Sequence, residues 1–305
     1  MLFMKMKFKT ILVLISIILL TSLGVSAQDM DNPNQIYLKD FQNNQDLINS
    51  ISNGSDDIVG SGVPFEEDIK FQQELKEFRV NEDDIEIKWN NGGINHTHQF
   101  LVARAIKILE NDIGKDKVGY YYQYTSTLLE NADWPDKYEN NFFTFLGHFY
   151  DPRTKENYLG GTSPTAMTNF KKYANMAVEA YKNNEHKKVN QYLGRALHYL
   201  GDANVPHHAE NKVAILSDHT KFEKWVDENR ENYITTSTDR YPLFNYSWNE
   251  NLEKIIDSCG YGAIGFIKEN RVPDYHLAAS QTMDNSQQYM TVFLYKFLQE
   301  VGEIE

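Results

Sequence analysis

Histidines paired with carboxylates at helical spacing are the residues of this sequence best suited to chemistry. His198 and Asp202 lie four positions apart, and so do His219 and Glu223. In a helix this spacing places both side chains on the same face. Imidazole and carboxylate are the ligands that zinc accepts where thiolates are absent. The spacing therefore predicts metal coordination, and an activated water is the chemistry that such a site offers.

Other candidate ligands lie outside these two pairs. Pro206 turns the chain after the first pair and brings His208 back toward it. Asp136 and His148 flank an aromatic segment, and His98 lies on the apolar face of an expected helix. Each residue alone is also compatible with a hydrogen-bonded core side chain or an ordinary contact, but burying so many ionisable groups unpaired is costly. The candidate metal ligands are therefore His98, Asp136, His148, His198, Asp202, His208, His219 and Glu223.

Helices are the elements expected to position these residues. Apolar side chains recur at helical spacing, and no alternating strand pattern competes over a comparable length. Helices are expected near 98–109, from Ser163-Pro164 to 181, from 188 to before Pro206, near 222–226 and from 277 to 298. We therefore expect one compact, all-α, multi-helix domain over residues 89–305.

The first 27 residues have the pattern of a signal peptide. Three lysines within the first nine residues precede an apolar run at 11–20, and small residues at 25–27 form a cleavage site. A membrane anchor is the alternative, but the run is shorter than the roughly 20 residues that span a bilayer. We therefore expect a secreted, extracellular protein.

Residues 28–88 are interpreted as a propeptide. They are rich in Asn, Gln, Asp and Glu, and they hold fifteen acidic and five basic residues, so most of the net charge of −13 lies there. A spacer without a processing role is the alternative. The rest of the chain is modestly acidic, so no nucleic-acid partner is expected. Cys259 is the only cysteine, which excludes an intrachain disulfide, so either bound metal or the core alone must stabilise an exported fold.

The run from His198 to Asn211 resembles the signature of the bacterial zinc-dependent phospholipase C family, which includes the small Bacillus lecithinases and the catalytic domain of clostridial alpha-toxin. The similarity extends from Trp89 to the C-terminus. It implies a helical fold around three zinc ions, with the signal peptide at 1–27, the propeptide at 28–88 and the catalytic domain at 89–305. In this family the mature chain begins with a Trp whose α-amine and carbonyl bind metal, and Trp89 matches that position.

The resemblance also implies how the ligands divide among the zinc ions. The three groups are Trp89, His98 and Asp202; His148, His198 and the shared Asp202, near Asp136; and His208, His219 and Glu223. Because a free α-amine binds zinc well and an amide nitrogen does not, cleavage of Lys88-Trp89 by an activating protease would complete the first group. The precursor is therefore expected to be a zymogen. His96 and His207 are the alternative ligands if the register is shifted by one or two residues.

The activity that the resemblance implies is phospholipase C. A zinc-bound water, oriented or deprotonated by Asp136, attacks the glycerol-side phosphodiester as hydroxide, and diacylglycerol and a phosphorylated head group are released. Phe145 matches an aromatic residue of the family's choline pocket, and Tyr138 is a second candidate because Lys137 stands where relatives often carry Tyr. Phosphatidylcholine, or a broader range that includes phosphatidylethanolamine, is the expected substrate. We expect a monomer that acts on membranes or micelles.

Two other functions fit part of the pattern. A zinc nuclease of the S1/P1 type shares the helical fold and the three-zinc cluster, although His208-Ala209-Glu210-Asn211 favours the phospholipase. A secreted protein that binds zinc without turnover is the second alternative, and the presence of Asp136 argues against it.

Overall fold

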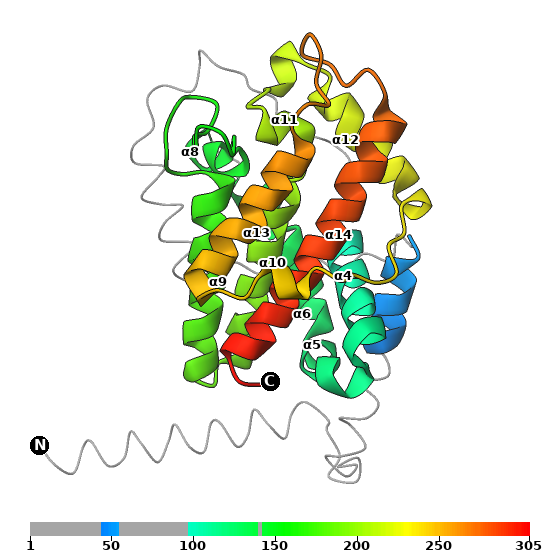
Figure 1. The fold of residues 1–305 in the computed structure, drawn as a ribbon, viewed down its shortest axis with the longest axis vertical. Helices are drawn as coiled ribbons and strands as arrows, with labels where there is room; N and C mark the ends of the chain where they lie inside the picture. The colour runs from blue at the N-terminus through cyan, green and yellow to red at the C-terminus, as the bar shows by residue number, and fades with distance from the viewer. Residues whose placement is uncertain (1–43, 55–96, 140–141) are drawn as a thin grey trace, which may run out of the picture. The chain divides into compact units, whose positions relative to one another are not determined.

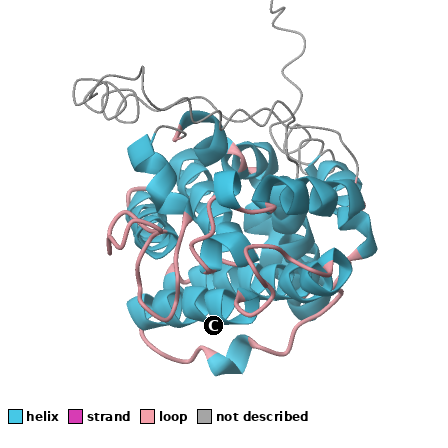
Figure 2. Cartoon of the chain, turned by 90° about the horizontal axis from the view of Figure 1, so that it is seen from above, coloured by secondary structure: helices cyan, strands magenta, loops and turns pink. Residues whose placement is uncertain are grey.

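The computed structural model describes residues 44–54, 97–139 and 142–305. Within these ranges the backbone forms helices, turns and loops, apart from isolated bridges that pair Asp151 with Glu156 and Lys268 with Arg271. Figure 2 shows only helices and loops among these residues. The expected all-α fold is therefore confirmed. The expected signal peptide, Trp89, His96 and most of the expected propeptide lie outside the described residues.

Long helices form the body of the described chain (Figure 1). They are α4 (Thr97–Ile113), α6 (Thr125–Ala132), α9 (Ala166–Lys182), α10 (His186–Asp202), α13 (Trp248–Ala263) and α14 (Tyr275–Glu300). Helix α10 packs against α9 and α6, while α14 packs against α4 and α13. Every residue of α10 from Leu193 to Asp202 is buried. The last turn of α10, with its candidate ligands, is therefore enclosed by the other helices.

The remaining helices and helical turns connect these elements. They are η2 (Lys115–Val118), α5 (Gly119–Gln123), α7 (Trp134–Tyr138), α8 (Phe142–Phe145), η3 (Leu146–His148), α11 (Pro206–Ala209), η4 (Ala214–Leu216), α12 (His219–Asn229), η5 (Arg230–Asn232) and η6 (Tyr241–Leu243). In Figure 1, α11 and α12 lie at the upper end, away from the C-terminus. The candidate ligands on these elements thus gather at the end of the fold where α10 terminates.

Helix α9 begins later than the sequence predicted. The expected start at Ser163-Pro164 is wrong, because α9 starts at Ala166. The Thr165 hydroxyl accepts a hydrogen bond from the Thr168 amide at 3.1 Å, and the Thr168 hydroxyl accepts one from the Thr165 amide at 2.7 Å. This reciprocal pair is a capping box, which satisfies amides that the first turn leaves without partners. A local side-chain contact therefore fixes the boundary.

The remaining helices divide into predicted and unpredicted ones. Helices α4, α10, α12 and α14 lie where apolar spacing predicted them, whereas the sequence analysis did not foresee α6 and α13.

Cys259, on α13, is fully buried. No helix among the described residues is long and apolar enough to cross a membrane. A further helix at 44–52 lies within the expected propeptide and buries Ile48 and Ile51.

Candidate metal centre

The last turn of α10 presents a histidine and a carboxylate to the same point. Nε2 of His198 lies 3.3 Å from an oxygen of Asp202, and both side chains are almost completely buried. Nδ1 of His198 is 2.8 Å from the carbonyl oxygen of Ala132. This contact fixes the ring so that Nε2 faces the centre, as second-shell partners do for metal-binding imidazoles.

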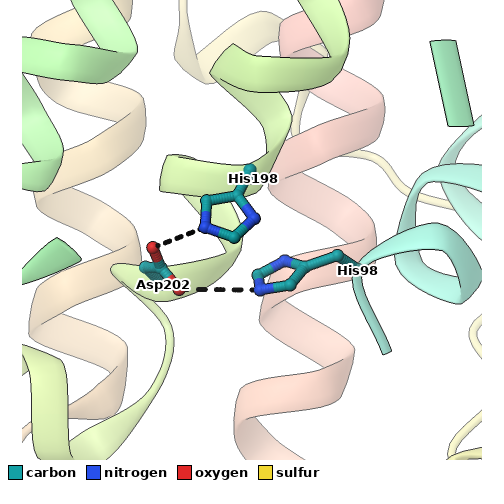
Figure 3. A group of neighbouring side chains, drawn as sticks. All are labelled: His98, His198 and Asp202. Carbon is teal, nitrogen blue, oxygen red and sulfur yellow. Dashed lines mark ion pairs between the residues drawn. The ribbon is translucent and has the colours of Figure 1, made fainter. Parts of the chain in front are cut away.

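Asp202 lies between histidines from three other elements. Its Oδ2 is 2.8 Å from Nδ1 of His148 on η3, and its Oδ1 is 3.6 Å from Nε2 of His98 on α4. Oδ1 is also 3.6 Å from Nδ1 of His208 on α11. Figure 3 shows His98 and His198 approaching this carboxylate from different helices. Asp202 can therefore be shared between neighbouring cations.

Asp136 lies at the open side of this cluster. One of its oxygens is 3.5 Å from Nε2 of His198 and 3.9 Å from Nδ1 of His148. The other oxygen is 4.0 Å from Nε2 of His98, and the side chain is 54% exposed. Asp136 therefore combines access to solvent with direct contact to the buried histidines.

A second cluster joins α11 to α12. Nε2 of His208 lies 2.8 Å from Nε2 of His219, and Oε1 of Glu223 lies 2.9 Å from Nε2 of His219 and 3.4 Å from Nε2 of His208. Nδ1 of His208 is 2.8 Å from the carbonyl oxygen of His148, which ties this cluster to the first one. His219 and Glu223 share one face of α12 because they are one helical turn apart.

These arrangements fit metal ions. The groups whose ligand atoms lie within 4.8 Å of one another are His98, His198 and Asp202; Asp136, His148 and His198; and His208, His219 and Glu223. Two ring nitrogens 2.8 Å apart repel each other unless a proton or a cation lies between them. Nδ1 of His98 and Nδ1 of His219 are buried and have no hydrogen-bond partner among the described residues. A cation between His208 and His219 would be bound by their facing Nε2 atoms.

The charges of the first cluster shift the pKa values of its members in opposite directions. Burial, with the nearby charge of His198, lowers the pKa of His98 to about 4. Burial also disfavours the charged form of His198, but the carboxylates of Asp202 and Asp136 outweigh burial and raise its pKa to about 10. Burial opposes ionisation of Asp202, yet the neighbouring imidazoles hold its pKa well below the usual value. At neutral pH, His98 is therefore neutral and keeps a lone pair for a cation.

His207, the alternative ligand for a shifted register, lies outside these three groups. Nε2 of His207 lies 2.8 Å from Oδ1 of Asp218, and Oδ2 of Asp218 accepts hydrogen bonds from the Tyr275 hydroxyl and the Val272 amide. The sequence analysis did not single out Asp218, although the adjacent His219 could have drawn attention to it. Asp218 fixes the start of α12 against α11 and α14, and it thereby positions His219.

Two further buried carboxylates next to the centre were also missed. Asp133 accepts a hydrogen bond from Gln99 at 2.7 Å, one residue from His98. Glu139 accepts hydrogen bonds from the hydroxyls of Tyr173 and Tyr199. The sequence gives no signal for either residue, because their partners lie between 34 and 60 positions away.

The expected head-group residues lie next to the centre. The ring of Phe145 is 5.6 Å from that of His148. Tyr138 follows Asp136 on α7, its ring 5.3 Å from Trp134, and the ammonium of Lys137 lies 5.4 Å from the Tyr138 ring. Both aromatic side chains are half-buried. Of the expected site residues, the structure brings together every one that it describes.

Comparison with known proteins places this centre in a family. The family model for zinc-dependent phospholipase C matches residues 97–269. A phospholipase C from Clostridium perfringens is 29% identical over 243 residues, which cover 68% of this chain and 59% of that protein. A phospholipase C from Bacillus cereus is 36% identical over 158 residues, which cover 49% of this chain and 55% of that protein.

The solved structure of an alpha toxin from Clostridium absonum has the same fold. It superposes with a TM-score of 0.63 at 24% identity, covering 68% of this chain and 65% of that one. The chain thus spans about 59% of the length of the clostridial relatives that it matches. The match over residues 97–269 includes all eight histidines and carboxylates of the centre, and the chain belongs to the zinc-dependent phospholipase C family.

Proposed function

We propose that this protein is a phospholipase C, which hydrolyses the glycerol-side phosphodiester of phospholipids to diacylglycerol and a phosphorylated head group. The observation that carries this proposal is the position of Asp136, a half-exposed carboxylate in contact with the buried histidines around Asp202. A phosphodiester that approaches from solvent meets Asp136 first. A site that only stored metal would have no use for such an exposed carboxylate.

The zinc ligands proposed here are the eight histidines and carboxylates of the centre together with the α-amine and carbonyl of Trp89. Bound zinc would supply a Lewis acid that activates water and neutralises charge on the phosphoryl oxygens. We propose three ions per chain, with Asp202 shared between two of them. Asp136 orients the attacking water and accepts its proton. His198 and His148 are held in place by Ala132 and Asp202, so the site needs little rearrangement during the reaction.

The proposed maturation follows from the part played by Trp89. The chain carries a signal peptide at 1–27 and a propeptide at 28–88, and a protease that cuts Lys88-Trp89 releases the α-amine that completes the site. The precursor is a zymogen, and the mature enzyme over 89–305 is secreted and monomeric. A precursor with an intact Lys88-Trp89 bond and full activity would contradict this scheme.

Exposed aliphatic residues next to the centre support a lipid substrate. Ile215 and Leu216 are 78% and 72% exposed, on η4 between the proposed ligands His208 and His219. They border a hollow of about 550 Å³ that Lys221 and Arg271 also line. Aliphatic side chains beside cations suit a surface of acyl chains and phosphates. A nuclease would have no comparable use for two exposed aliphatic residues.

We propose phosphatidylcholine as substrate, with phosphatidylethanolamine also accepted. Phe145 and Tyr138 lie beside Asp136 and His148, and aromatic faces attract a quaternary ammonium. Lys137, next to Tyr138, adds a positive charge that weakens this preference for choline. We therefore expect a weaker preference for choline over ethanolamine head groups than a pocket lined only by aromatic side chains would give.

The test is release of phosphorylated head group from phosphatidylcholine by protein that begins at Trp89. We expect turnover with zinc, none after chelation, and a loss of about 100-fold or more in Asp136→Asn. The control is Asp284→Asn, which changes a half-buried carboxylate on α14 that contacts Thr235. Zinc-loaded protein that leaves phospholipids intact but degrades single-stranded DNA would replace this proposal with the nuclease.

A further inference from the structure

Residues 44–54 pack against the domain as a folded segment. They form a helix at 44–52 whose Ile48 and Ile51 are 0% and 3% exposed. Gln45 and Ser52 are also buried, whereas Asn49 is exposed. The segment thus has an inner face that contacts the domain and an outer face that meets solvent. We call residues 44–54 the docked segment.

Polar contacts fix both ends of the docked segment. Near its start, Gln45 hydrogen-bonds Tyr122 of α5. At its end, Nη2 of Arg230 donates to the carbonyl oxygen of Gly54 at 3.1 Å. Gly54 has a φ of +91°, and a Cβ there would lie 3.0 Å from the side chain of Glu231. Only glycine therefore fits this conformation and this close approach without displacing η5.

Arg230 connects the docked segment to the helix that carries His98. Its Nη1 donates to the carbonyl oxygen of Asp227 at 2.5 Å and lies 3.3 Å from the Asp227 carboxylate. Oδ1 of Asp227 accepts a hydrogen bond of 2.9 Å from the hydroxyl of Thr97. Thr97 is the first residue of α4, and His98 is the second. Figure 1 shows the docked segment, in blue, alongside α4.

We propose that the surface formed by Tyr122, Arg230 and Glu231 is a binding site for the docked segment, and that docking holds the His98 end of α4 in place. The guanidinium of Arg230 is 5% exposed and connects Gly54 to Asp227. Docking of the apolar face orients Gly54 toward Arg230, and Arg230 in turn fixes the carboxylate that accepts the Thr97 hydrogen bond. In the uncleaved chain, residues 44–54 are therefore a positioning element for one of the candidate metal ligands. This inference is independent of the proposed activity.

Hydrogen exchange of the full chain, followed by mass spectrometry, tests both halves of the proposal. The variant is Ile48→Asp, which places a charge on the inner face, and the matched control is Asn49→Asp, which places the same charge on the outer face. Ile48→Asp should speed exchange by about tenfold or more both in residues 44–54 and in the first turn of α4, and Asn49→Asp should leave both slow. Unprotected amides at 44–54 in the unmodified chain would overturn the docking.

A second variant separates docking from its transmission to α4. Thr97→Val removes the hydroxyl that donates to Asp227 while keeping the side chain similar in shape. We expect faster exchange in the first turn of α4 and weaker zinc binding, while residues 44–54 stay protected. If Ile48→Asp releases the docked segment but both the first turn of α4 and the zinc affinity are unchanged, the positioning role is wrong.

Discussion

The carboxylate of Asp202 lies 2.8 Å from Nδ1 of His148, although the two residues are 54 positions apart in the chain. Asp202 also approaches His98 and His198, so a single side chain connects α4, η3 and α10. No other carboxylate among the described residues is as buried and as close to so many imidazoles. The centre therefore depends on Asp202 more than on any single histidine.

Asp202→Asn is expected to abolish two of the three proposed zinc sites together. An amide oxygen binds zinc more weakly than a carboxylate and does not offset the positive charge of the bound ions. The loss of activity should exceed the roughly 10–100-fold typical of outer-shell partners. Zinc analysis of the purified variant, compared with Asp284→Asn, measures the ion loss directly. Retention of all bound zinc would mean that Asp202 is not a shared ligand.

Glu223→Gln is expected to remove one zinc and leave the first cluster intact. Glu223 contacts His208 and His219, and these imidazoles outweigh the effect of burial and hold its pKa below the usual value. The variant should bind one zinc equivalent less, because an uncharged amide replaces the carboxylate. Zinc titration followed by calorimetry measures the number of sites. A fall of two equivalents would show that the clusters are coupled through the contact between His208 and His148.

Asp133 is expected to make the metal-free protein less stable as the pH rises. Burial, followed by the charge of Asp136, raises the pKa of Asp133 from 3.8 to about 8. A raised folded-state pKa means that the folded chain holds this proton more tightly than the unfolded chain does. The stabilisation is therefore complete below about pH 4 and is lost as the pH rises through about 8.

The isostere Asp133→Asn, which cannot ionise, tests this dependence. Thermal unfolding of chelated protein between about pH 5 and about pH 9 should show the Tm of the variant rising relative to that of the unmodified chain. Asp284→Asn is the control for loss of a carboxylate elsewhere. A constant difference in Tm across the range would show that Asp133 is already ionised in the folded protein at pH 5.

The exposed pair Ile215 and Leu216 is expected to matter at a lipid surface and not for chemistry. Replacing both with Ser should lower hydrolysis of vesicles by roughly tenfold or more, since burying even one aliphatic side chain contributes about 1.5–3 kcal/mol. Hydrolysis of a short-chain, monomeric phospholipid should change by less than about twofold. Leu243→Ser, at an exposed leucine on η6, is the matched control. Equal losses on both substrates would place the pair in the catalytic machinery instead.

Much of the centre could be predicted from local sequence. The four-residue spacing of His198 with Asp202 and of His219 with Glu223 is read directly from helical geometry. Pro206 starts α11 and brings His208 to the first cluster, as expected. The positions of these residues can be predicted because helix periodicity and the backbone restriction at proline depend only on residues close in the sequence.

The rest depends on contacts that no local pattern encodes. Asp133 and Asp218 are defined by partners on distant helices. Helix α6 is only eight residues long, which is too short for an extended apolar pattern, and it packs against α10 and α4. The helix at 44–52 is too short to be stable alone, and it has tertiary support because Ile48 and Ile51 are buried and Gly54 contacts Arg230. Tertiary packing decided these elements, and the sequence analysis therefore missed them.

The buried thiol of Cys259 gives the protein an internal reporter of opening. It is fully buried on α13 near Asn204, two residues beyond Asp202, and burial raises its pKa far above that of a free thiol. Such a thiol reacts with a labelling reagent only when the surrounding helices separate. The rate at which this single cysteine is modified therefore reports how often the metal-bearing end of the fold opens. Zinc binding should lower this modification rate, and no probe has to be introduced to measure it.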